Sequence, residues 1–359
     1  MTKKKVAVAM SGGVDSSLTA AILLDKGFDV IGITMKLSAE FDDLYSSDRR
    51  CCSANEANDA RRVADFLCIP HYVVDFHEDF QNKVVNNFIN EYIKGHTPNP
   101  CVACNKYIKF GSLFNFIDEL DIDYLATGHY ARIEEVNGKF QLLKGFDLKK
   151  DQSYVLYNIK AEQLSRMLLP LGGQSKEETR ALAEKLDLPV AHKPDSQEIC
   201  FVPNDDYKTF LTKNADKTSD ALQPGEIVDT YGNVLGHHNG AAFYTIGQRK
   251  GLGIAHETPL YVTKLDIPNR QVIVGGAGDV FRDSLKAKDL HWIYPQIFPL
   301  TATAKVRYGP KIAECVVNEL DSGEVMVNFS NPQRAITAGQ SIVFYDGDIV
   351  LGGGIIDDT

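Results

Sequence analysis

The chain of 359 residues contains no apolar run that approaches the roughly 20 residues of a membrane-spanning helix. It also lacks an excess of positive charge, because 38 Lys and Arg residues stand against 48 Asp and Glu residues, a formal net charge of −10. Internal repeats and low-complexity tracts are absent. We therefore expect neither a membrane protein nor a repeat protein. The acidic total argues mildly against a nucleic-acid partner, although only the charge of the contact face decides that.

The N-terminus MTKKKVAVAM has lysines followed by apolar residues, as a signal peptide has, but the apolar run stops at Met10. We therefore expect a cytoplasmic protein with no membrane partner. Seven cysteines are an odd number, and a reducing compartment disfavours a disulfide framework. Metal-binding or catalytic roles for some of these cysteines gain weight accordingly.

Strand and helix patterns alternate through the first two hundred residues. The predicted strands cover residues 5–9, 29–35, 71–76 and 123–129, and the predicted helices cover 16–26, 55–67 and 107–120. This order is typical of a parallel sheet with helices on both faces, whose ligands lie beyond the carboxyl ends of the strands. From Gly225 onward, short β-branched and aromatic runs are broken by Gly, Asn and Asp. We predict an α/β domain at 1–206, a β-rich domain at 207–278 and a β-barrel at 279–359.

The segment SGGVDSS at residues 11–17 lies between the first strand and the first helix. Its two glycines let the backbone approach a ligand, and the helix that follows directs free N–H groups toward an anion. Ser11, Ser16 and Ser17 add hydroxyl groups, and Asp15 is a candidate ligand of Mg²⁺. The loop lacks the lysine of the G-x-x-x-x-G-K-S/T motif. A glycine-rich turn with capping side chains is the alternative, and the position after a strand favours phosphate binding.

SGGVDSS resembles the pyrophosphate loop of ATP pyrophosphatases, which cleave ATP to AMP and pyrophosphate. Five further segments follow it in order: TPNPCVACNKYIKF at 97–110, ATGHYAR at 126–132, KDQSYVLY at 150–157, DSQEICFV at 195–202 and YTIGQRKGLGI at 244–254. Together they resemble the bacterial tRNA-specific 2-thiouridylases, the MnmA family, along nearly the whole chain. The resemblance implies replacement of the C2 oxygen of the wobble uridine of tRNA by sulfur, with ATP as cosubstrate.

The resemblance also implies roles for two cysteines. Cys200 matches the carrier of a persulfide, and Cys104 matches a second catalytic cysteine that releases the sulfur and leaves a disulfide. Lys106 and Lys109 would lie near Cys104 and favour its thiolate. Cys68 and Cys315 are expected in the core.

Cys101 departs from the family pattern, in which many relatives have Asp at this position. We keep three readings open for it: a bystander, a redox partner of Cys104, or a metal ligand. In the third case Cys101, Cys104 and Cys200 would hold a 4Fe–4S cluster with one iron open to sulfide. Of these three interpretations we favour the first, in which Cys101 is a bystander and sulfur is transferred by the persulfide of Cys200.

The same resemblance assigns the remaining contacts. It implies that Met35 contacts the adenine and that Gly128 lies against the nucleotide. The residues implied to line the ATP phosphates are Ala9, Met10, Ser11, Gly12, Gly13, Val14, Asp15 and Ser16. It implies that Asn99, Pro100 and Cys101 contact the target base. The other implied tRNA contacts are His129, Lys150, Asp151, Gln152, Arg307, Tyr308 and Gln340. We expect a β-carbon at position 128 to crowd the ligand. We also expect basic spots at residues 248–250 and at Lys305, Arg307 and Lys311, and a flipped wobble base.

The partners implied are the Lys, Glu and Gln tRNA isoacceptors and, as sulfur donor, a cysteine desulfurase or a relay protein. Two other functions stay open. One is a different adenylating synthetase, which the paired cysteine segments disfavour. The other is an RNA-binding module with a structural metal at C-x-x-C, which leaves SGGVDSS unexplained and lacks a second ligand pair.

Overall fold

The computed structural model describes residues 3–38, 54–195, 199–309 and 311–357. The chain divides into two compact units. The first comprises Met1–Val85, Pro100–Asp205 and Asp348–Val350, and the second comprises Asn86–Asn99, Asp206–Gly347 and Leu351–Thr359. Residues 86–99, which lie inside the predicted first domain, therefore group with the second unit.

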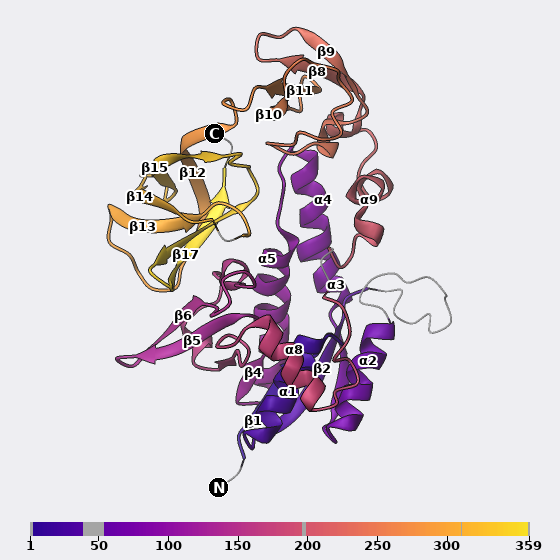
Figure 1. Ribbon diagram of the computed structural model, residues 1–359, viewed down its shortest axis with the longest axis vertical. Coiled ribbons are helices and arrows are strands. Elements are labelled where there is room, and N and C mark those ends of the chain that lie inside the picture. Colours follow the sequence, from indigo (N-terminus) through magenta and orange to yellow (C-terminus); the bar gives the residue numbers. More distant parts are fainter. Residues whose placement is uncertain (1–2, 39–53, 196–198, 310, 358–359) are drawn as a thin grey trace. The chain divides into compact units, whose positions relative to one another are not determined.

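The first unit is built on a five-stranded sheet in the order β3-β2-β1-β4-β7 (Figure 1). The strands are β1 (Lys5–Ala9), β2 (Asp29–Lys36), β3 (His71–Asp75), β4 (Tyr124–Ala126) and β7 (Met167–Leu168). Every neighbouring pair is parallel. The predicted parallel sheet is confirmed, with β7 as a strand that the sequence pattern did not reveal. Because all the strands run the same way, their carboxyl ends meet at one edge.

Helices α1 (Val14–Asp25) and α2 (Ala54–Phe66) share a core cluster with the sheet. Val6 and Val8 of β1 pack there with Leu23 of α1 and Val63 of α2. Strand side chains two residues apart point to the same face, so these two helices cover one face. Helix α1 also packs on α8 (Lys176–Lys185), and most of α1 is buried. Its first turn is therefore held rigidly at the end of β1.

The rest of the first unit consists of short helices and one hairpin. The helical segments are α3 (His77–Phe80), η2 (Gln81–Val85), α5 (Pro100–Cys104), η3 (Asn105–Ser112), α6 (Leu113–Glu119), η4 (Ser153–Val155), α7 (Ala161–Leu164) and η5 (Pro203–Asp205). The predicted helix at 107–120 is thus the later part of a continuous run α5–η3–α6. The hairpin joins β5 (Ala131–Val136) to β6 (Lys139–Lys144).

The second unit contains helices and a small mixed sheet. Its helical segments are α4 (Asn86–Ile93), α9 (Tyr207–Asn214), η6 (Asp220–Leu222) and η7 (Ala241–Phe243). Strands β8 (Gly225–Asp229), β9 (Val234–His238), β10 (Tyr261–Asp266) and β11 (Gln271–Gly275) form a sheet in the order β10-β11-β8-β9. Only the β11–β8 pair is parallel. The predicted β-rich character of this stretch is confirmed.

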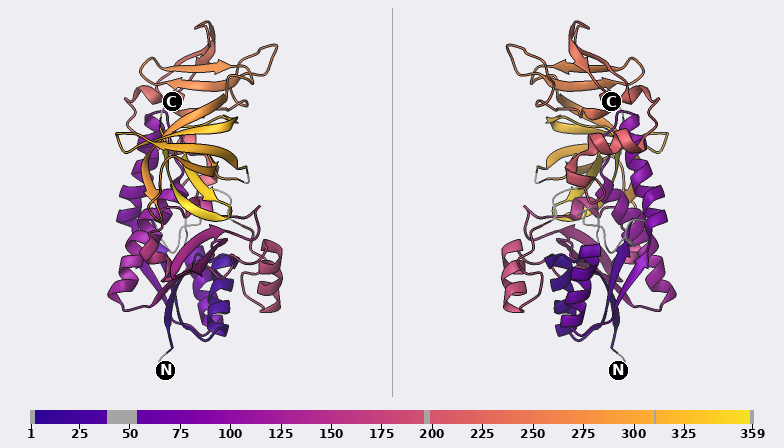
Figure 2. Two further views of the ribbon diagram at one scale, coloured as in Figure 1. Left: turned by 90° about the vertical axis from the view of Figure 1, so that its left-hand side faces the viewer. Right: turned by 90° about the vertical axis from the view of Figure 1, so that its right-hand side faces the viewer.

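A closed six-stranded barrel follows, drawn in orange and yellow in Figure 2. Its strands are β12 (Phe281–Trp292), β13 (Leu300–Lys305), β14 (Ala313–Glu319), β15 (Val325–Arg334), β16 (Ser341–Asp346) and β17 (Ile349–Ile356). The order is β12-β15-β14-β13-β16-β17, and pairing of β12 with β17 closes it. The predicted barrel is confirmed. Among the described residues, no helix is long and apolar enough to cross a membrane.

A partly buried group of hydrogen-bonded side chains fixes the end of α4 in the second unit. Glu91 accepts hydrogen bonds from His96 Nδ1 at 2.7 Å and from Lys94 Nζ at 2.8 Å. The bond from His96, helped by Lys94 and opposed by burial, lowers the pKa of Glu91 to about 2. In the residue after His96, the N–H of Thr97 donates to Ala338 O. The contacts of Glu91 and Thr97 together hold the chain that leads to Asn99.

We expect Glu91→Gln to lower the free energy of unfolding by about 2–3 kcal/mol at neutral pH, because the carboxylate is stabilised in the folded state. A depressed folded-state pKa stabilises fully above the unfolded value, here 4.5, and the benefit is lost as pH falls toward about 2. Thermal melts of the wild type and the variant should therefore converge near pH 2. A difference that persists undiminished at that pH would contradict this assignment.

Candidate functional site

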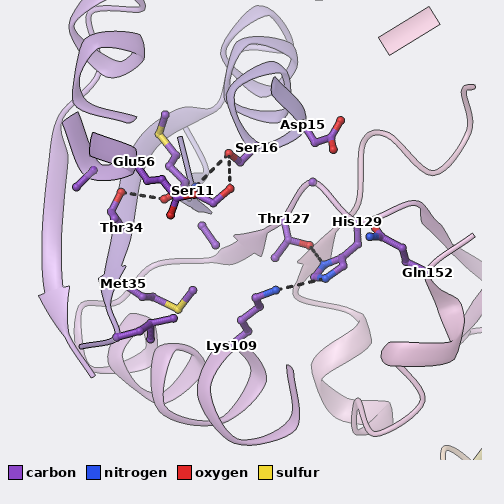
Figure 3. A pocket seen from close by; sticks show the side chains of 15 residues that line it. Ser11, Asp15, Ser16, Thr34, Met35, Glu56, Lys109, Thr127, His129 and Gln152 are labelled. Atoms are coloured by element: carbon purple, nitrogen blue, oxygen red, sulfur yellow. Dashed lines mark hydrogen bonds between the residues drawn. The ribbon is translucent and has the colours of Figure 1, made fainter. Parts of the chain in front are cut away.

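A pocket of about 200 Å³ lies at the carboxyl ends of β1, β2 and β4 in the first unit (Figure 3). Its lining comes from each of these strand ends, from the first turn of α1, from α2, from η3 and from the segment before η4. The lining residues are Ala9, Met10, Ser11, Asp15, Ser16, Thr34, Met35, Leu37, Glu56, Ala57, Lys109, Thr127, Gly128, His129 and Gln152. This is the edge at which a parallel α/β sheet binds its ligands.

The loop between β1 and α1 forms the upper wall of the pocket. Ser11 N–H donates to Ser16 Oγ at 3.1 Å, and Gly13 precedes the helix without a side-chain cap. The first N–H groups of α1 are thus available to an anion. Gly12 has φ +69°, and a β-carbon there would lie 2.2 Å from Glu56 O, so only glycine fits. Ser17 is fully buried and donates to Gly13 O at 2.9 Å, so it supports the loop from behind.

Gly128, two residues after β4 ends, lies against this loop. A β-carbon at Gly128 would lie 2.8 Å from the carbonyl carbon of Asp15 and 2.9 Å from Ser16 N. The loop backbone is therefore one physical reason for a glycine at this position, and the expected crowding of the ligand stays a prediction. Gly128 still lines the pocket.

The carboxylate of Asp15 is directed away from the centre of the pocket (Figure 3). Its Oδ1 accepts hydrogen bonds from Lys176 Nζ at 2.6 Å and from Tyr130 OH at 2.9 Å. Burial and the neighbouring carboxylate raise the pKa of Tyr130, so this phenol remains a donor. Asp15 thus joins the loop at residues 11–17 to α8 in this structure.

Lys176 continues this network to Asp195. Its ammonium lies 2.9 Å from Asp195 Oδ1, and the Lys176 side chain is only 9% exposed. Asp195 also accepts from Lys150 at 2.9 Å and Arg180 at 2.6 Å. Burial opposes ionisation of Asp195, but the bonds from Lys150 and Lys176 outweigh it and hold its pKa at about 2. The network therefore connects the loop at residues 11–17 to Asp195, through Asp15 and Lys176.

A second group of polar side chains lies on the opposite side of the pocket. Lys109 Nζ lies 3.5 Å from His129 Nε2, and His129 Nδ1 lies 2.7 Å from Thr127 Oγ1 (Figure 3). Burial, assisted by the charge of Lys109, lowers the pKa of His129 well below its usual value. The imidazole is therefore neutral. Because an ammonium can only donate, Nε2 accepts from Lys109 and Nδ1–H donates to Thr127.

Seven of the ten predicted nucleotide-binding residues line the pocket: Ala9, Met10, Ser11, Asp15, Ser16, Met35 and Gly128. Gly12 and Gly13 shape the loop, and Val14 is buried in the core. His129 and Gln152, predicted as tRNA contacts, also line it. Their assigned ligands stay predictions. Sequence reasoning missed Thr34, Glu56 and Thr127, as well as the Lys176 network.

The cysteine segments lie on neighbouring elements of the first unit. Helix α5 carries Cys101, which is exposed, and Cys104, which is half-buried, and it packs on η2. Cys200 is exposed, and the adjacent Phe201 makes an edge-to-face contact with Phe80, the last residue of α3 before η2 begins. Burial by the surrounding protein atoms raises the pKa of the Cys101 thiol, although part of its surface is exposed. The positive charge of Lys109 opposes this rise in pKa.

The other cysteines differ from one another. Cys315 is buried in the barrel, as expected, whereas Cys68 is exposed two residues after α2 ends, so its expected core position was wrong. Cys51 and Cys52 lie outside the described residues.

The described residues offer no ready metal site. No group of three or more His, Cys, Asp or Glu side chains among them is arranged to hold a metal ion. Cys101, Cys104 and Cys200 are therefore not gathered as a cluster would require, and the Asp15 carboxylate is occupied by Lys176. The residues fit neither a 4Fe–4S cluster nor a protein-held Mg²⁺ in this arrangement.

Several predicted tRNA contacts lie in the second unit. Gln340 Nε2 donates to Thr97 O at 2.6 Å, two residues before Asn99. Arg307 is exposed and donates to the carbonyl groups of Arg334 and Ala335. Tyr308 is 48% exposed.

Other members of the predicted tRNA set are less accessible. Lys305 is only 3% exposed, so the expected basic cluster with Arg307 and Lys311 is incomplete. Pro100 is buried. Asp151 is 5% exposed and accepts from the Gly145 and Ser153 amides, so it shapes a turn.

Three family models match successive parts of the chain. Their descriptions are "tRNA methyl transferase HUP domain" for residues 4–204, "tRNA methyl transferase PRC-barrel domain" for 208–276 and "Aminomethyltransferase beta-barrel domain" for 282–356. The chain is also 50% identical to the tRNA-specific 2-thiouridylase MnmA of Acetivibrio thermocellus, over 99% of this chain and 100% of that protein. It is 50% identical to MnmA 1 of Caldanaerobacter subterraneus, over 98% of both.

The chain belongs to the family of tRNA-specific 2-thiouridylases. The resemblance drawn from the short motifs is thereby confirmed, since members of the MnmA family match it from end to end. A solved 4-thiouridine synthetase–RNA complex with bound ATP is also similar, with a TM-score of 0.37 and 17% identity over 58% of this chain and 50% of its own. That likeness is too low to support a conclusion.

Proposed function

We propose that this chain is a tRNA sulfurtransferase that replaces the C2 oxygen of the wobble uridine with sulfur and converts ATP to AMP and pyrophosphate. The observation that carries this proposal is the end-to-end identity of 50% with enzymes named for 2-thiouridine formation. The pocket at the sheet edge, with the loop at residues 11–17 on its wall, supplies a place for ATP. The tRNAs for Lys, Glu and Gln are the proposed substrates.

The C2 oxygen of uracil is a poor leaving group, so activation comes first. This oxygen attacks the α-phosphorus of ATP, and pyrophosphate leaves with the electron pair of the broken P–O bond. In this proposal the free loop amides and the Ser11 hydroxyl group donate to the phosphates, and Met35 contacts the adenine; these residues line the pocket or its loop. Ser16 contributes through its amide, because its hydroxyl group donates to Gly13 O. Fixed donors of this kind stabilise the charge that develops on the phosphate oxygens.

Sulfur transfer then uses two cysteines. The terminal sulfur of a persulfide on Cys200 attacks C2, and AMP leaves with the oxygen and its electron pair. The Cys104 thiolate attacks the sulfur atom of Cys200, which releases the thiolated base and forms a Cys104–Cys200 disulfide. An external thiol must supply two electrons to reduce this disulfide, and a cysteine desulfurase or a relay protein must renew the persulfide.

The test is nucleoside analysis of tRNA from a bacterium that lacks its own 2-thiouridylase and expresses this chain. We expect 2-thiouridine derivatives to return, and the Cys68→Ser variant to restore them equally. Mass spectrometry separates sulfur exchange from methyl addition, the activity that the family-model descriptions name. Methylated wobble uridine without sulfur, or no new nucleoside, would refute the proposal. Pyrophosphate exchange without RNA would favour a different synthetase.

A further inference from the structure

The nucleotide pocket has an unusual balance of charge. The loop at residues 11–17 carries no lysine, and the lining includes two acidic residues, Asp15 and Glu56. The carboxylate of Asp15 is directed away from the centre of the pocket, toward Lys176 (Figure 3). Among the described residues, Lys109 is the one Lys or Arg side chain in this lining. A positive side chain strengthens the binding of a polyphosphate beyond what the loop amides supply, because hydrogen bonds between ionised groups are stronger than neutral ones. A lysine or arginine that makes this contribution must come from outside the loop.

Two lysines near the loop form ion pairs with carboxylates. Lys176 bridges Asp15 and Asp195, and Lys193 donates to Asp59 at 2.9 Å. Lys109 differs from them, because within the described part of the chain it makes no ion pair, and its hydrogen-bond contact is with His129. Its positive charge is therefore not cancelled by a neighbour.

The partner of Lys109 is suited to direct an ammonium group without neutralising it. His129 is 8% exposed and neutral, so it accepts one hydrogen bond from Lys109 and adds no opposing charge. Thr127 at 2.7 Å fixes which ring nitrogen carries the proton. A carboxylate at this place would hold the lysine as firmly but would cancel its charge.

We propose that Lys109 binds the phosphate groups of the nucleotide in this pocket, in place of the lysine that the loop lacks, and that His129 is the residue that positions it. Lys109 therefore belongs to the nucleotide site, beyond its expected influence on the Cys104 thiolate. The proposal rests on the proposed function, since ATP is taken as the nucleotide.

The decisive experiment measures binding of ATP with Mg²⁺ and of adenosine by calorimetry. We expect Lys109→Met to weaken ATP binding by about tenfold to a hundredfold and to leave adenosine binding unchanged, because only ATP carries phosphate charge. Lys106→Met is the matched control: Lys106 lies on the same helix over the ring of Tyr107, outside the lining, and this change should leave both affinities unchanged.

A second pair of variants tests His129 as the positioning residue. His129→Gln retains an acceptor for the ammonium and should keep most of the ATP affinity, whereas His129→Phe keeps a ring without the acceptor and should lose as much as Lys109→Met. If Lys109→Met binds ATP normally, or loses ATP and adenosine equally, the inference fails while the proposed function stands. If the wild type binds no ATP, both fail.

Discussion

Replacement of Cys200 by serine is expected to lower 2-thiouridine formation by roughly a thousandfold or more, while tRNA-dependent release of pyrophosphate continues. Serine is similar in size but cannot carry the persulfide sulfur that attacks C2. Cys200 is exposed, so the change removes no core packing and the fold should be unaffected. The measurement is single-turnover thiolation of an unmodified tRNA, with pyrophosphate followed in the same reaction.

Two comparisons make this result specific. Cys68→Ser, at another exposed thiol, should thiolate at the wild-type rate. Full thiolation by Cys200→Ser would remove Cys200 from the mechanism. The iron content of the protein tests the cluster alternative. If sulfur is transferred by the persulfide, protein purified anaerobically and treated with iron and sulfide should bind no iron. The Cys101→Ala variant should then remain active. Bound iron that Cys101→Ala loses together with activity would favour the cluster.

The sequence predicted those parts of the fold whose pattern is local. The strand at 5–9 coincides with β1, because an apolar run before a glycine-rich turn is unambiguous. Strand β7 has only two residues, too few to show any periodicity, and it exists through pairing with β4. Residues 86–99 read as part of the first domain by position, but their contacts are with residues such as Ala338, which no local pattern reveals.

The candidate site shows the same division between local and distant information. The loop at 11–17 and the turn at Gly128 carry their own signatures, and both lie at the pocket. Lys176 left no signal, because it looks like the first residue of an ordinary capped helix after Ser175. Its role arises only when folding brings it to Asp15, 161 positions away in the chain. His129 was assigned to tRNA by resemblance, and its burial beside Lys109 became visible only in three dimensions.

Replacement of Lys176 by methionine is expected to lower the free energy of unfolding by about 3 kcal/mol, because it leaves Asp15 and Asp195 facing each other without their shared cation. Both carboxylates are partly exposed, so the cost lies at the low end for a broken buried pair. For a unit of this size the melting temperature should fall by roughly 6–12 °C. ATP binding should weaken as well, because the Asp15 carboxylate loses the cation that balances its negative charge near the proposed phosphate site and keeps the hydrogen bond from Tyr130. Thermal melts and calorimetry measure the two effects.

Lys185→Met is the matched control, since Lys185 is exposed in the last turn of the same helix and should change neither quantity. The double variant Lys176→Met with Asp195→Asn tests the cause. Removal of the Asp195 carboxylate relieves its repulsion with Asp15. The double variant should therefore lose less free energy of unfolding than the two single variants lose in sum. The sign of that coupling distinguishes electrostatic bridging from packing of the lysine stem. Additive losses would mean that Lys176 contributes through its buried methylene groups, and that the bridge from the phosphate loop to Asp195 has no energetic weight.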